Sequence, residues 1–235
     1  MKIIPQNHPH IKEFSRQAPF YDKYNIIQKK AAKKLMEKIK NKPKKILDIG
    51  CGSGEIYKNI EWEIELFIGV DLSSNMCKLH PKNEKIKVIC ENFENEKLYE
   101  NLTQFAPFDI VISSSALQWA KNPDKIFKKL ASLSERWAIS LFCDKTFKTI
   151  RELAKIPSSL PSKKDIVKIA SKYKKCSFES VEYRLFFKDN LSKFRYIKKS
   201  GVSGGEKKLS FKEIKNLIEN YPLPYLEFEV IYIIS

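Results

Sequence analysis

Short apolar runs alternate along the chain with longer stretches in which apolar and basic residues follow a helical period. The apolar runs predict strands at 46–49, 66–70, 86–90, 108–113 and 137–143. Helical spacing predicts a helix over 24–39, and Asn122-Pro123 predicts the N-cap and first residue of a helix through 133. Strands that alternate with helices are typical of a doubly wound parallel sheet.

After residue 143 this alternation gives way to turn-rich sequence and more widely spaced elements. A basic amphipathic helix over 163–175 and a strand over 178–187 are predicted, and Asn190 is the expected N-cap of a short helix that Gly201 closes. Ser210 and Glu213 form a possible capping box for the last helix, before a strand over 226–234. We therefore expect one α/β domain, a mostly parallel seven-stranded sheet with a small helical insert.

The same pattern divides this single domain into four parts. Residues 1–45 would form N-terminal helices and a lid, and 46–147 the half that binds a ligand. Residues 148–210 would be a substrate-side insert with a late strand, and 211–235 the closing helix and strand.

The run Leu47-Asp-Ile-Gly-Cys-Gly-Ser-Gly54 holds three of the seven glycines. It follows an apolar strand, so its amide groups can face a ligand at a tight turn. Glu55 stands where a dinucleotide-binding loop needs a small residue, whereas Asp48 suggests a ligand with a positive group, such as an α-amino group. The alternative is an ordinary glycine turn.

Asp71 ends the second predicted strand, 17 residues after Gly54. A carboxylate in this place can accept both ribose hydroxyls of an adenosine group. Asp71 can instead cap the following helix, although Ser73 is also available for that task. Asp109, at the fourth strand, is expected to be structural.

The charge of the chain indicates the kind of partner that it binds. The net charge of +16 predicts an acidic partner, namely nucleic acid, a membrane surface or an acidic protein. Only five of the 44 basic residues are arginines, which argues against specific recognition of nucleic-acid bases. The alternative explanation of the charge is a generally lysine-rich composition that implies no partner.

Five scattered cysteines without a Cys-x-x-Cys pair, no apolar run of membrane length and no secretory signal predict a reduced, cytoplasmic protein. The three histidines form no metal-ligand set, so no metal is expected.

The Asp-x-Gly-x-Gly-x-Gly run resembles the S-adenosylmethionine loop of class I methyltransferases, which have a Rossmann-like sheet. The resemblance implies that S-adenosylmethionine is the cofactor. It also implies a cofactor site made of Arg16, Asp48, Gly50, Gly52, Gly54, Asp71, Leu72, Asn92, Phe93 and Ser113.

Three further segments narrow the resemblance to carboxylate O-methyltransferases. Ala116-Leu-Gln-Trp119 is similar to two such families, which act on trans-aconitate or on malonyl-acyl carrier protein in early biotin synthesis. The segments 14–21 and 191–201 resemble the second family more closely. That resemblance implies methyl transfer to the free carboxylate of malonyl-acyl carrier protein. This carboxylate is already ionised at neutral pH, so no general base is expected.

The resemblance also implies substrate-positioning roles for Tyr21, Gln118, Trp119 and Arg195, and a contact from Arg16 to the cofactor's carboxylate. The alternatives are that Arg195 is a surface residue, that Trp119 belongs to the core, and that Arg16 and Tyr21 only fasten a lid. An acidic acyl carrier protein would dock on lysine-rich faces formed by Lys164, Lys168, Lys172, Lys198 and Lys199.

Other functions remain open at this point. A small carboxylic acid such as trans-aconitate, or a quinone ring carbon, is the alternative acceptor. Charge alone would suit an RNA methyltransferase, and a protein that binds the cofactor without catalysis is the fourth possibility.

Overall fold

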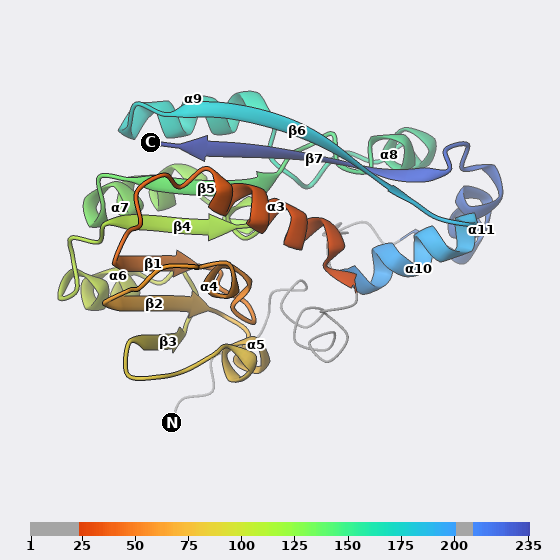
Figure 1. The fold of residues 1–235 in the computed structure, drawn as a ribbon. Helices are drawn as coiled ribbons and strands as arrows, with labels where there is room; N and C mark the ends of the chain where they lie inside the picture. Colours follow the sequence, from red (N-terminus) through yellow and green to blue (C-terminus); the bar gives the residue numbers. More distant parts are fainter. Residues whose placement is uncertain (1–23, 201–208) are drawn as a thin grey trace.

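The computed structural model describes residues 24–200 and 209–235 (Figure 1). Arg16, Tyr21, Gly201 and most of the predicted lid lie outside the described residues. The roles expected for these residues stay predictions, as does the division of the chain into four parts.

Seven strands form one sheet in the order β3-β2-β1-β4-β5-β7-β6. Strands β1 to β5 pair in parallel, whereas β7 is antiparallel to both β5 and β6. The strands are β1 (Lys45–Ile49), β2 (Leu66–Asp71), β3 (Ile86–Cys90), β4 (Ile110–Ser114), β5 (Trp137–Phe142), β6 (Ser177–Phe186) and β7 (Tyr225–Ile234). The predicted mostly parallel seven-stranded sheet is therefore confirmed.

The central strands are buried on both faces, and their alternate side chains enter two separate cores. Ile46 of β1 joins the core beneath helix α3 (Ile26–Glu37), while Leu47 joins the core on the opposite face. Figure 1 shows α3 crossing in front of the sheet, with α6 and α7 behind it. Burial on both faces explains why these strands read as continuous apolar runs.

The remaining helices cover the two faces and the carboxyl edge. They are α4 (Glu55–Lys58), α5 (Ser74–Leu79), α6 (Glu96–Thr103), α7 (Pro123–Leu133), α8 (Lys148–Ala154), α9 (Lys163–Tyr173), α10 (Asn190–Ser200) and α11 (Phe211–Asn220). Helices α6, α7 and α9 pack on the same core, and α10 and α11 contribute to the core beneath α3. Helix α8 is not among the elements that the sequence patterns predict.

Local capping signals gave correct helix starts in two places. Asn122 caps α7 by accepting a hydrogen bond from Lys125 N, and Ser210 and Glu213 form the predicted capping box of α11. The prediction that Asn190 is an N-cap is wrong. The Asp189 side chain accepts the hydrogen bond from Ser192 N at 2.6 Å, while Asn190 lies inside α10 and bonds elsewhere.

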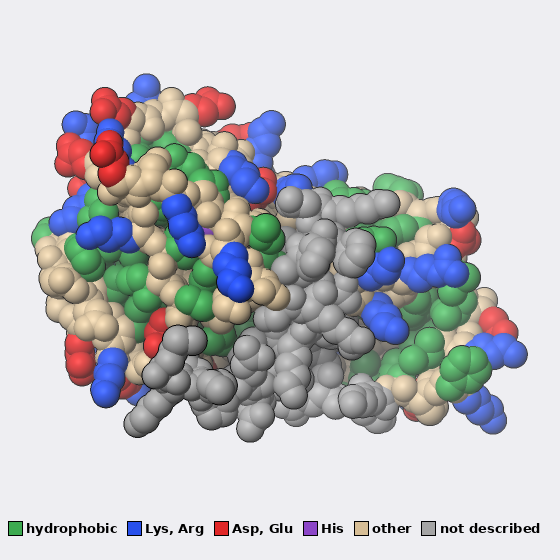
Figure 2. All heavy atoms as spheres, turned by 90° about the horizontal axis from the view of Figure 1, so that it is seen from below, with side chains coloured by type: hydrophobic (Ala, Val, Ile, Leu, Met, Phe, Trp, Pro, Cys, Tyr) green, Lys and Arg blue, Asp and Glu red, His purple; other side chains and the backbone are tan. Residues whose placement is uncertain are grey.

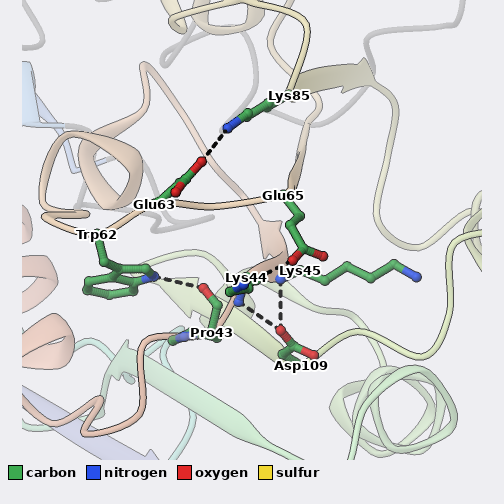
Figure 3. A network of polar contacts seen from close by, with 8 residues as sticks. All are labelled: Pro43, Lys44, Lys45, Trp62, Glu63, Glu65, Lys85 and Asp109. Carbon is green, nitrogen blue, oxygen red and sulfur yellow. Dashed lines mark hydrogen bonds and ion pairs between the residues drawn. The ribbon is translucent and has the colours of Figure 1, made fainter.

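Strand β4 begins two residues later than predicted. The residue just before it, Asp109, bonds through its side chain to the backbone at the amino end of β1 (Figure 3). Its Oδ2 accepts hydrogen bonds from Lys44 N at 2.7 Å and Lys45 N at 2.9 Å. Nearby, Trp62 Nε1 donates to Pro43 O at 2.7 Å. These bonds lie at the amino ends of β1 and β4, which leaves the carboxyl ends of the strands available for a ligand. The structural role expected for Asp109 is confirmed.

Candidate cofactor site

The glycine loop between β1 and α4 forms a tight turn at the carboxyl edge of the sheet. Gly50, Gly52 and Gly54 all have positive φ, at 76°, 54° and 90°. A Cβ on Gly50 would stand 2.1 Å from the Ala116 Cβ, so glycine is required there for close packing. Among the residues that the structure describes, a Cβ on Gly52 would meet nothing within 4 Å. Those residues leave space beside Gly52, as a loop that receives a ligand requires.

Asp71 holds this loop from the end of β2. Its two carboxylate oxygens accept hydrogen bonds from Gly52 N at 2.9 Å and Ser73 N at 2.8 Å. Desolvation raises the pKa of Asp71, and the two backbone N–H donors oppose that rise. Ser73 caps α5, so Asp71 is not needed as its cap. Each carboxylate oxygen keeps acceptor capacity for a hydroxyl group.

Asp48 lies beneath the loop and is 1% exposed. Neither of its carboxylate oxygens has a hydrogen-bond partner among the described residues. Burial, and secondarily the charge of Asp71, raises the pKa of Asp48 well above its ordinary value. An orphaned buried carboxylate is unstable as an anion unless a donor or a positive group reaches it. Asp48 therefore suits a ligand that carries an ammonium group.

A cavity of about 40 Å³ lies between the glycine loop and α3. Its walls come from α3, from the loop and α4, and from Ser114 at the end of β4. Gln28 and Ala32 on α3 and Asn25 at its N-cap position line the cavity, and Gln28 is 7% exposed. Sequence reasoning missed Gln28. The available signal was a polar residue four positions before Ala32, on a helix face that is otherwise apolar.

The end of β4 is held mainly by its own hydrogen bonds. Ser113 Oγ donates to Ile49 O at 2.7 Å, so this predicted cofactor residue links β4 to β1. Gln118 is buried and donates from Nε2 to Ser115 O at 2.7 Å. Its Oε1 has no partner among the described residues. Trp119 is half-buried and packs against the core beneath α3, as the alternative of a core residue predicts. Its contact with a substrate stays a prediction.

The predicted adenine side lies after β3. Asn92 Oδ1 already accepts a hydrogen bond from Glu94 N at 2.9 Å, which leaves one lone pair for a ligand. Phe93 packs against the core beneath α6 and α7. Leu72 is half-buried, and its carbonyl oxygen lies 3.8 Å from Cys90 Sγ. The structure brings Leu72 near Asp71, and the cofactor roles of these residues stay predictions.

Helix α10 carries Arg195 on an exposed face. The opposite face holds the helix in place, because Lys193 is 3% exposed and donates to Asn190 Oδ1 at 2.7 Å. Asn190 Nδ2 in turn donates to Ile218 O at 2.8 Å and to Tyr221 O at 3.0 Å. Arg195 takes part in no ion pair among the described residues.

The predicted lysine groups lie at opposite ends of a long strand. Helix α9, with Lys164, Lys168 and Lys172, precedes β6, and α10, with Lys198 and Lys199, follows it (Figure 1). Ten residues of strand span about 30 Å. Lys172 is also paired with Asp124 at 2.6 Å. Figure 2 shows, on the face seen from below, basic side chains on both sides of the residues drawn in grey.

Within the described ranges, no group of three or more His, Cys, Asp or Glu side chains is placed to hold a metal ion. None of the helices in residues 24–200 and 209–235 is long and apolar enough to cross a membrane.

Comparison with known proteins agrees with this geometry. Residues 47–135, which run from within β1 to just past the end of α7, match the family described as methyltransferase domain. A solved structure from Thermotoga maritima, described as an S-adenosylmethionine-dependent methyltransferase and possible histamine N-methyltransferase, has the same fold. It aligns with a TM-score of 0.57 and 16% identity over 95% of this chain and 98% of that one. The class I methyltransferase fold is thus shown.

Several curated proteins that are similar to this chain share one name. The malonyl-[acyl-carrier protein] O-methyltransferase of Anoxybacillus flavithermus is 33% identical over 144 residues, 58% of this chain and 53% of that protein. A protein of the same name from Calditerrivibrio nitroreducens is 24% identical over 88% of this chain and 85% of its own length. In the first relatives, the match spans about half of their length.

The residues around the glycine loop fit S-adenosylmethionine chemically. Among the described residues, Gly52 leaves space for a ligand, and Asp48 would offer to its amino group a carboxylate that has no other partner. Asp71 offers acceptor capacity to its ribose hydroxyls.

Proposed function

We propose that this protein transfers a methyl group from S-adenosylmethionine to the free carboxylate of a malonyl group carried by an acyl carrier protein. The observation that carries the choice of acceptor is the shared name of relatives between 24% and 33% identical to this chain. The geometry of the loop supports the choice of cofactor.

S-adenosylmethionine supplies an electrophilic methyl group when it is bound. The acceptor carboxylate is ionised at neutral pH, so no proton has to be removed. The protein's residues must therefore align the acceptor with the methyl group and exclude water. Asp48, Asp71 and the glycine loop hold the cofactor, while the end of β4 and α10 approach the acceptor side.

Arg195 is the residue proposed to hold the acceptor carboxylate. A guanidinium can bind a carboxylate through two parallel hydrogen bonds and is always charged. Replacing Arg195 with alanine should lower kcat/KM for the malonyl carrier at least tenfold, with the affinity for S-adenosylhomocysteine unchanged within about twofold. Arg184→Ala is the matched control, since Arg184 is an exposed arginine on β6 that stacks over Tyr225 at 4.9 Å. Equal losses of transfer and cofactor affinity in Arg195→Ala would contradict this role.

The decisive experiment gives the purified protein S-adenosylmethionine and malonyl-acyl carrier protein and weighs the intact carrier by mass spectrometry. A gain of one methyl group, absent with acetyl-acyl carrier protein, is the expected result. No gain, with S-adenosylhomocysteine binding confirmed by calorimetry, would overturn the proposed acceptor. Parallel reactions with malonyl-coenzyme A, trans-aconitate and a quinone would then identify the acceptor class.

A further inference from the structure

Gln28 is a buried polar residue that the functions above do not use. It lies on α3, outside the residues 47–135 that match the methyltransferase family, and it lines the cavity together with the glycine loop. A glutamine that is only 7% exposed needs partners for both ends of its amide.

Within the described residues, one end of this amide has a partner and the other has none. Gln28 Nε2 donates to Ser200 O, the last residue of α10, at 3.3 Å. A carbonyl oxygen can only accept a hydrogen bond, so this contact fixes the orientation of the amide. Oε1 is then left as a buried acceptor with no partner among the described residues.

Asp48 supplies further orphaned acceptors at the same loop, since both of its oxygens are buried without a partner in the described ranges. These buried acceptors, which have no partner among the described residues, suit a ligand group with several N–H donors and, next to a carboxylate, a positive charge. A primary ammonium group has both properties. Three backbone N–H groups of the loop are already engaged, because Gly50 N and Cys51 N donate to Val70 O and Gly52 N donates to Asp71 Oδ2.

We propose that Gln28 Oε1 accepts a hydrogen bond from the cofactor's α-amino group while Gln28 Nε2 holds the end of α10, so that one amide couples cofactor binding to the position of α10. The inference rests on the proposed function for the identity of the cofactor. It extends that function by assigning a cofactor contact to α3 and a physical link from the cofactor to the helix that carries Arg195.

The coupling follows from how α10 is held. Asn190 holds its first turn to the carbonyls of Ile218 and Tyr221, and Gln28 holds its last residue. A ligand that fixes the Gln28 amide also orders its bond to Ser200 O. Because coupling is reciprocal, whatever orders α10 must strengthen cofactor binding by the same factor.

Two substitutions separate the two ends of the amide. Gln28→Met has a similar length but neither donates nor accepts strongly, so it removes both contacts. Gln28→Glu keeps acceptor oxygens for an ammonium group but cannot donate to Ser200 O. Gln104→Met is the matched control, since Gln104 is exposed and bonds only the nearby Asn101 carbonyl.

Calorimetry should be run with three ligands on each variant. S-adenosylhomocysteine has the amino and carboxylate groups, decarboxylated S-adenosylmethionine has only the amine, and 5′-methylthioadenosine has neither. Gln28→Met should weaken the first two about tenfold or more and leave methylthioadenosine within twofold, because a hydrogen bond to a charged group is lost. Gln28→Glu should keep the affinity for the two amines.

Hydrogen exchange tests the second half of the proposal. S-adenosylhomocysteine should slow amide exchange across residues 190–200 in the native protein and in Gln104→Met. It should fail to do so in Gln28→Glu, even at saturating ligand. Slowed exchange in Gln28→Glu would overturn the coupling.

Equal weakening of all three ligands by Gln28→Met would show a folding effect and overturn the amino-group contact, as would no weakening at all. These are binding measurements, so they stand even if malonyl-acyl carrier protein proves not to be the acceptor. Absence of S-adenosylhomocysteine binding by the native protein would overturn both proposals.

Discussion

At the residue scale, the site depends on a few side chains whose polarity conflicts with their burial. Asp48 is the clearest case, with both oxygens buried and no donor among the described residues. Such a group opposes folding when it is charged and favours binding of a cation. The ligand-free protein should therefore be less stable than the same fold without this charge.

Asp48→Asn should raise the melting temperature of the ligand-free protein at neutral pH and weaken S-adenosylhomocysteine binding. The pKa of Asp48 is raised in the folded state, so the folded protein binds more protons than the unfolded chain above about pH 4. Stability is then lost as pH rises from that value towards the raised pKa, and the asparagine variant lacks this loss. Thermal unfolding of both proteins across this range is the measurement, and parallel pH profiles would contradict the argument.

Gly52 and Gly54 make a matched pair at the same loop. An alanine at either position has an unfavourable positive φ, which costs about 1–2 kcal/mol. At Gly52 the added methyl enters open space, so Gly52→Ala should fold with about this loss and bind S-adenosylhomocysteine at least tenfold more weakly. At Gly54 the methyl would stand 2.7 Å from Pro81 Cδ, so Gly54→Ala should destabilise the fold more. Unchanged affinity in Gly52→Ala would place the ligand elsewhere.

At the scale of elements, helix α10 is positioned by residues distant from it in the sequence. Asn190 reaches carbonyls at the end of α11, and Ser200 is held by α3. Local sequence signals assigned Asn190 a capping role because asparagine is common at N-caps. Its actual partners lie about thirty residues further on, where only the folded structure places them.

Asn190→Ala should lower the free energy of unfolding by about 2 kcal/mol, because two partly buried carbonyls lose a donor and Lys193 loses an acceptor. Methyl transfer should fall more than cofactor affinity, since α10 carries Arg195. Asn220→Ala is the control, because Asn220 is exposed and bonds only to Asn216. Chemical denaturation and transfer assays on both variants would decide, and equal behaviour of the two would contradict the role of Asn190.

At the scale of the whole molecule, the separation of α9 and α10 limits how an acidic carrier can dock. The lysines of the two helices are separated by the length of β6. The α10 lysines are on the same helix as Arg195, whereas the α9 lysines lie at the other end of β6. Charge steering acts over about 10 Å at ordinary salt, which is shorter than that separation. We therefore expect the carrier to use the α10 end.

Lys198→Glu should raise KM for malonyl-acyl carrier protein several-fold and reduce its salt dependence, while KM for malonyl-coenzyme A should stay the same. Lys168→Glu on α9 is the matched control and should change neither value, since Lys168 is likewise an exposed helix lysine. Steady-state kinetics at two salt concentrations would test this. A larger effect at Lys168 would move the docking site to α9, and no effect at either would exclude charge-driven docking at these two lysines.

Much of the fold and part of the site were predictable because their causes are local in the sequence. Apolar runs specify buried parallel strands, and glycines at alternate positions specify the loop after β1. The capping box of α11 and the Asn122 cap of α7 each need only four consecutive residues. Asp48 and Asp71 were identifiable from their places beside the loop and at the end of β2.

The order of the seven strands agrees with the family that the loop resembles. Other features could be identified only from the tertiary structure. Gln28 lies in the cavity because α3 packs over a loop that follows it in the chain. Asp48 is buried without a partner among the described residues, which depends on how the segments around it pack. The distance between the lysine groups is a consequence of the length of β6. The sequence by itself determined which elements form, because periodicity and capping act over a few residues. Tertiary structure alone decided which polar groups are left without partners, because burial depends on segments far apart in the chain.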